Sequence, residues 1–122
     1  MNLTPEERYI LQYIRHYPDW VASIENISTV RAISYDSDKV QTSPDDTMLD
    51  LTIRIEEYQE RIDKVERCLA SAFGTDARIK QMRLAFCYGK RPRMRAKTYC
   101  AMRKIFAEKL TYVFADLIEE RR

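Results

Sequence analysis

Glycine, histidine and cysteine are all scarce in this chain, and each shortage argues against a class of protein. Only two glycines, Gly74 and Gly89, occur in 122 residues. Two glycines so far apart exclude both the glycine-rich loop that cradles phosphate groups and the dinucleotide-binding fingerprint. Strand-rich folds also need many glycine-dependent turns. The composition therefore favours an all-α protein with long helices and few loops.

Catalytic and metal-binding patterns are also missing. His16 is the only histidine, so no paired-histidine metal motif can form. The three cysteines, Cys68, Cys87 and Cys100, form no Cys-x-x-Cys pair, and their wide spacing favours reduced thiols over a disulfide framework. Cys87 and Cys100 lie in a basic segment that could lower a thiol pKa, but inert, buried thiols are the commoner case. We expect no enzymatic activity, no cofactor and no metal.

Long apolar runs are absent too. No run approaches the ~20 residues of a transmembrane helix, and the N-terminus lacks the basic and apolar regions of a signal peptide. The hydrophobic content of 45% is enough to bury a core. We expect a cytoplasmic protein that does not bind membranes.

The most informative shortage is that of acidic residues between residues 77 and 107. This segment holds ten Lys or Arg residues and no Asp or Glu, which leaves 11 basic residues against all 19 acidic ones elsewhere. The small net charge of +2 therefore hides a strongly divided molecule. Such a division favours a polyanionic partner, of which nucleic acid is the commonest.

The N-terminal sequence predicts a long, interrupted helix. Thr4, Pro5 and Glu7 form a capping-box start. Proline inside the following heptad pattern, at Pro18, predicts a kink or two helices nearly in line. The polar stretch 34–43 is expected to be a loop.

A second long helix is expected to begin at Pro44, with Ser43 as its N-cap. Its apolar seam steps alternately by three and four residues: Met48, Leu51, Ile55, Tyr58, Ile62, Val65, Leu69 and Ala72. The two long helices predict an antiparallel hairpin over 1–73. The seam is satisfied either within one chain or in a homodimer.

A basic C-terminal helical region over 74–122 is expected to pack on this hairpin. Gly74 ends the second helix, and a third helix runs from Thr75 or Asp76 to about Tyr88. After a turn around Pro92, a fourth helix is expected from about Met94 to Glu120. Four aromatic or aliphatic residues widen its apolar face and suggest burial on more than one side: Tyr99, Ile105, Tyr112 and Phe114.

Two helices joined by a short basic turn have the outline of a helix-turn-helix, which binds double-stranded DNA. Cations in the turn would hold the phosphate backbone, and residues of the following helix would face phosphates or bases. Tyr99 would either stack on a base or ribose, or pack inward. The candidate nucleic-acid-binding residues are Arg83, Lys90, Arg91, Arg93, Arg95, Lys97, Thr98, Tyr99, Arg103 and Lys104.

Three features resemble the phage and prophage transcriptional regulators of the RinA and ArpU type. They are the tyrosine-rich N-terminal helix, the segment 38–44 ahead of a long helix, and a C-terminal stretch with Arg95, Thr98, Tyr99, Met102 and Arg103. The resemblance implies a helical, non-enzymatic activator of late phage genes with a C-terminal DNA-binding region.

One departure from that family separates two hypotheses. Only residues 89–97 separate the third helix from Thr98, whereas family members place a helix and turn of roughly 20 residues before the recognition helix. This shortening argues against sequence-specific reading, leaves phosphate binding open and favours the alternative hypothesis. The alternative hypothesis is a helical interaction module that docks on a host transcription protein or another host protein and inhibits or redirects it.

Overall fold

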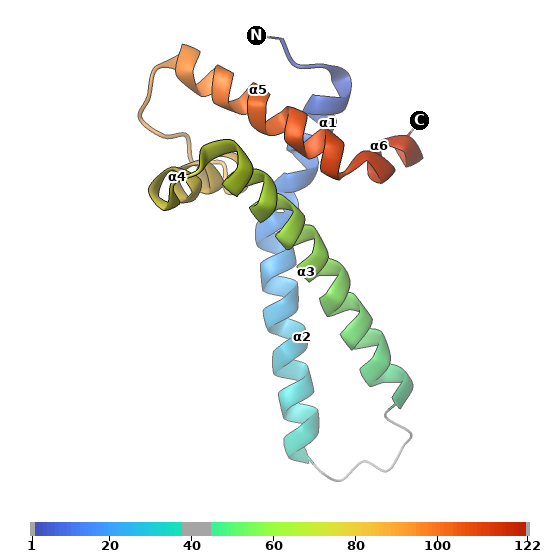
Figure 1. The fold of residues 1–122 in the computed structure, drawn as a ribbon. Helices are drawn as coiled ribbons and strands as arrows, with labels where there is room; N and C mark the ends of the chain where they lie inside the picture. The colour runs from blue at the N-terminus through green and yellow to red at the C-terminus, as the bar shows by residue number, and fades with distance from the viewer. Residues whose placement is uncertain (1, 38–44, 122) are drawn as a thin grey trace.

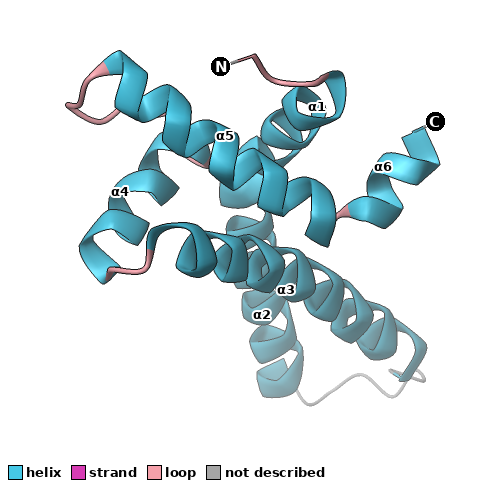
Figure 2. Ribbon diagram, turned by 45° about the horizontal axis from the view of Figure 1, so that its top comes forward, coloured by secondary structure: helices cyan, strands magenta, loops and turns pink. Residues whose placement is uncertain are grey.

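The computed structural model describes the backbone of residues 2–37 and 45–121, and the side chains of residues 2–28 and 49–120. Within these ranges every regular element is a helix, which confirms the all-α class (Figure 2). No helix among them is long and apolar enough to cross a membrane. The elements are α1 (Pro5–Tyr13), the 3-10 helix η1 (Ile14–His16), α2 (Tyr17–Ser37), α3 (Asp45–Phe73), α4 (Asp76–Phe86), α5 (Ala96–Val113) and α6 (Ala115–Arg121).

The N-terminal helix begins and breaks where the sequence predicts. The Glu7 backbone N–H donates to Thr4 Oγ1 at 3.1 Å, and the Thr4 backbone N–H donates to Glu7 Oε1 at 2.8 Å. The helix is then interrupted by η1, directly before α2 begins with Tyr17 and Pro18. Proline lacks the N–H that a continuous α-helix would need at that position, so the turn tightens there.

The predicted loop over 34–43 starts too early. Residues 34–37 belong to α2, because extending an existing helix is much easier than nucleating one, even through polar residues. The rest of that loop, with the predicted cap at Ser43 and Pro44, lies outside the described residues. The next helix begins at Asp45.

Helices α2 and α3 lie side by side and run in opposite directions, so that the last turn of α2 and the first turn of α3 lie at the same end of the molecule (Figure 1). At the other end, α5 lies across both α1 and α3, and α4 packs on α3 (Figure 1). Both chain termini lie at this second end.

One hydrophobic core fills the end where α5 crosses. Phe106 of α5 is fully buried, and its ring lies 5.9 Å from that of Phe73 and 5.1 Å from that of Phe86. Ile10 and Leu69 are fully buried in the same cluster. The core thus draws on residues from both sides of the predicted division at 73/74.

The C-terminal helix differs from its prediction in two ways. It starts at Ala96 and is broken at Phe114, whose φ of −101° and ψ of 31° are not helical, so α6 is a separate short helix. The expected burial of Ile105 and Tyr112 is wrong: they are 46% and 85% exposed. Phe114 does turn inward, against Tyr13. Since Val113 and Phe114 carry no glycine or proline signal, the sequence pattern could not mark this break.

Candidate nucleic-acid interface

A short connector between α4 and α5, together with the first turn of α5, brings most of the predicted basic residues to the surface. The chain leaves α4 through Cys87, turns at Gly89 with a φ of +72°, and enters α5 at Ala96. The Lys90 backbone N–H donates to the Leu84 carbonyl at 2.9 Å and closes the turn. A positive φ disfavours side-chain-bearing residues, which explains the glycine at this position.

Five cations and one hydroxyl are presented along this connector and the start of α5. All six are exposed: Lys90, Arg91, Arg93, Arg95, Lys97 and Thr98. None of the five cations forms an ion pair within the part of the chain that the structure describes. The first turn of α5 contains no acidic residue, and its N-cap, Arg95, supplies no side-chain hydrogen bond. The positive charge here is not compensated locally.

Tyr99 takes the inward of its two predicted orientations. It is half-buried, and its ring lies 5.5 Å from that of Phe86. Two guanidinium groups approach the same ring, that of Arg91 at 5.1 Å and that of Arg103 at 5.9 Å. Cations are attracted to the electron-rich face of an aromatic ring. Tyr99 therefore orients two arginines and has little free ring face for a base.

Arg103 is half-buried beside this ring. Its Nη2 contacts Cys100 Sγ at 3.9 Å, while its Nε is buried and has no hydrogen-bond partner among the described residues. Arg103 thus belongs to the boundary between the core and the basic surface.

Arg83 turns away from the connector, into an ion pair with α3. Its Nε donates to Glu66 Oε1 at 2.7 Å, its Nη2 donates to Glu66 Oε2, and the Tyr17 hydroxyl donates to Glu66 Oε1 at 2.6 Å. Burial by itself would raise the pKa of Glu66, but the hydrogen bonds from Arg83 and Tyr17 outweigh it, and the pKa is lowered. Burial and the hydrogen bond to Glu66 together raise the pKa of Tyr17.

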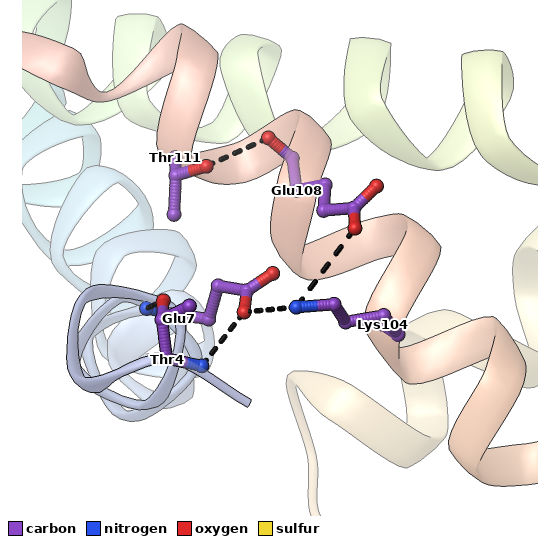
Figure 3. A network of polar contacts seen from close by, with 5 residues as sticks. All are labelled: Thr4, Glu7, Lys104, Glu108 and Thr111. Carbon is purple, nitrogen blue, oxygen red and sulfur yellow. Dashed lines mark hydrogen bonds and ion pairs between the residues drawn. The ribbon is translucent and has the colours of Figure 1, made fainter. Parts of the chain in front are cut away.

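Lys104 forms a second such contact, between α5 and α1 (Figure 3). Its Nζ donates to Oε1 of Glu7, a carboxylate whose residue is only 3% exposed, and lies 3.8 Å from Glu108 Oε1. Burial would raise the pKa of Glu7, but the bond from Lys104 and those from Thr4 lower it. This ammonium group neutralises a buried carboxylate.

The ten predicted site residues therefore divide by position. Lys90, Arg91, Arg93, Arg95, Lys97 and Thr98 lie together at the surface, Tyr99 and Arg103 lie at its edge, and Arg83 and Lys104 pair with acidic residues. Glu66 lies 17 residues from Arg83 along the chain, and Glu7 lies 97 residues from Lys104. No local sequence pattern could therefore have predicted these two ion pairs.

One further cation belongs to the same surface and was missed. Arg15 of η1 lies against Gly89, where an added Cβ would come within 3.1 Å of the Arg15 guanidinium carbon. Arg15 is far in sequence from the turn at Gly89. The one sequence signal near Arg15 is the helix break expected at Pro18, and it does not show which segment Arg15 contacts.

The thiols are shielded by the fold. Burial raises the pKa of Cys87 to about 12 and that of Cys68 to about 11. Both thiols therefore stay protonated near neutral pH, so the basic surroundings of Cys87 do not activate it. Among the described residues, no group of His, Cys, Asp and Glu is arranged to hold a metal ion.

None of the protein-family models, curated proteins or solved structures compared with this chain matches it.

Proposed function

We propose that this protein is a non-enzymatic regulator of transcription, of phage or prophage origin, that binds double-stranded DNA through the connector between α4 and α5. In this proposal the helical hairpin is the scaffold, and the basic pair of helices packed on it presents the binding surface. The observation that carries it is the group of five exposed cations without ion-pair partners among the described residues: Lys90, Arg91, Arg93, Arg95 and Lys97.

The reason is the contrast between the two kinds of basic residue. Arg83 and Lys104 each have a carboxylate partner within the fold, whereas the connector cations have none in the described part of the chain. Clustered cations repel one another, and an external polyanion relieves that repulsion. Duplex DNA presents closely spaced phosphates, whose contacts supply most of the sequence-independent binding energy.

Base reading is a smaller part of this proposal. Of the three residues that could discriminate bases, Tyr99 and Arg103 are half-buried against one another and Thr98 is exposed. Contacts to phosphates position a protein without reading sequence. The proposed activity is therefore DNA binding with a modest preference for sequence, read chiefly at Thr98.

Charge reversal tests the proposal. The triple variant Arg91→Glu, Arg93→Glu and Arg95→Glu is expected to lose duplex binding in a gel-shift or fluorescence-anisotropy assay at low salt. Its matched control reverses three exposed arginines elsewhere, Arg8, Arg54 and Arg67, with the same change in net charge. Equal affinity of the two triple variants would refute the connector as the binding surface.

A second candidate function is docking on a host protein, and one observation favours it. Tyr112 is 85% exposed on α5, beside a groove of about 430 Å³ between α3 and α5 that also contains Arg67, Cys68 and Lys109. Exposed aromatic side chains beside a groove are typical of protein interfaces. An interaction with a host protein that is lost in Tyr112→Ser and kept in the connector triple variant would favour this candidate.

A further inference from the structure

The 3-10 turn η1 brings an N-terminal arginine to the C-terminal basic connector. Arg15 occupies the middle of η1, between the fully buried Ile14 and the exposed His16. Ile14 fixes the orientation of the turn from the core side, and Arg15 points outward. His16 is turned to Asp19, with Nδ1 3.3 Å from Oδ2, and so does not compete for the same space.

Two separate observations place the Arg15 guanidinium at the connector. A Cβ built on Gly89 would lie 3.1 Å from Arg15 Cζ and 3.6 Å from its Nη1, so the guanidinium packs on the bare glycine backbone. Burial raises the pKa of the nearby Cys87 thiol, and Arg15 is among the charges that act against this rise. The Arg15 guanidinium therefore lies against Gly89, the residue that precedes Lys90.

No carboxylate in the described part of the chain neutralises Arg15, which forms no hydrogen bond or ion pair there. Glu66, which also acts on the Cys87 thiol, is held by Arg83 and Tyr17. The charge of Arg15 therefore adds to that of the connector. Because Arg15 packs on Gly89, the residue before Lys90, its positive charge and that of the connector act on the same region, and an anion bound there would be attracted by both.

We propose that Arg15 is part of the nucleic-acid-binding surface and contacts a backbone phosphate of the duplex together with Lys90. This inference rests on the proposed function and extends its surface from the C-terminal segment to the N-terminal helix. Gly89 has a second role in it, because any side chain at that position would displace the guanidinium. The 3-10 turn η1 before Pro18 also has a role in the proposal, because it sets the direction in which the Arg15 side chain leaves the helix.

The salt dependence of duplex binding tests the assignment. Each phosphate contact contributes about 0.9 to the slope of log affinity against log salt concentration. Arg15→Ala is expected to lower that slope by about 0.9, whereas Arg54→Ala, an exposed arginine on the distant part of α3, is expected to leave it unchanged. Arg15→Lys is expected to retain most of the slope. Thermal unfolding of each variant confirms that binding is measured on folded protein.

The outcomes separate the two proposals. If wild-type protein binds duplex DNA and Arg15→Ala has the same slope as Arg54→Ala, the assignment of Arg15 is overturned and the proposed function stands. If wild-type protein shows no binding at low salt, both are overturned. A slope lowered in both Arg15→Ala and Arg15→Lys would overturn the assignment as well, because a charge contact to phosphate tolerates lysine.

Discussion

At the scale of single residues, charge pairing decides which cations serve the fold and which face solvent. Arg83 and Lys104 satisfy Glu66 and Glu7, whose carboxylates lie at helix contacts. Sequence reasoning grouped these two cations with the connector because all lie in one acid-free segment. The carboxylates that pair with Arg83 and Lys104 come from α3 and α1. Helix packing brings these carboxylates to the two cations, and the sequence alone does not show that packing.

The ion pair and hydrogen bonds of Glu66 predict that the stability of the fold decreases at low pH. Because its pKa is lowered below the ordinary value of 4.5, Glu66 stabilises the fold fully above about pH 4.5, and this contribution is lost as pH falls through the lowered pKa. Glu66→Gln is expected to reduce the free energy of unfolding at pH 7 by about 1–3 kcal/mol. The variant should also lose less stability than wild type between pH 5 and about pH 3.

Urea unfolding across this pH range measures both effects. Glu60→Gln is the control, because Glu60 pairs with Lys64 at the surface of the same helix. Surface pairs of this kind contribute little. A wild-type and a Glu66→Gln profile that run parallel across the whole range would argue against the stabilising role of the network.

At the scale of elements, α5 holds the structure together. It lies across α1 and α3, and its fully buried residues Phe106 and Leu110 reach the common core. The helices on either side of the connector, α4 and α5, are held together through the stacked rings of Phe86 and Phe106. The position of the proposed binding surface therefore depends on this aromatic contact.

Truncation of the central ring tests this dependence. Phe106→Ala removes a fully buried ring and is expected to cost about 3–5 kcal/mol of unfolding free energy. Tyr112→Ala, on the exposed side of the same helix, is expected to change it by less than about 0.5 kcal/mol. Chemical denaturation compares the two. Similar losses for both variants would show that α5 is not anchored by Phe106.

The sequence predicted helices where caps and heptads are strong, and failed where long-range packing decides. The capping box at Thr4, the end of α3 at Gly74 and the seam through Ile62, Val65 and Leu69 are all present. The break at Phe114 was missed because a core aromatic, rather than a glycine or proline, marks it. For the site, the exposed cations of the connector follow from their local polarity, whereas the position of Arg15 follows only from the folded chain.

At the scale of the whole molecule, the acid-free segment separates into an inner and an outer part. The inner part consists of Arg83 and Lys104, which pair α4 and α5 with acidic residues of α3 and α1. These ion pairs neutralise part of the positive charge of the segment. The outer cations remain available along the connector and the start of α5. The divided charge of the sequence thus accounts for both helix packing and the proposed DNA surface.

The affinity of the wild-type protein for a short duplex, measured across a series of salt concentrations, tests the central claim most directly. If the five exposed cations of the connector and the start of α5 each contact a phosphate, the slope of log affinity against log salt concentration should be about −4.5. A sixth contact, from Arg15, would make the slope about one unit steeper. Affinity that is negligible at low salt, or a slope near zero, would contradict the claim that this surface binds DNA.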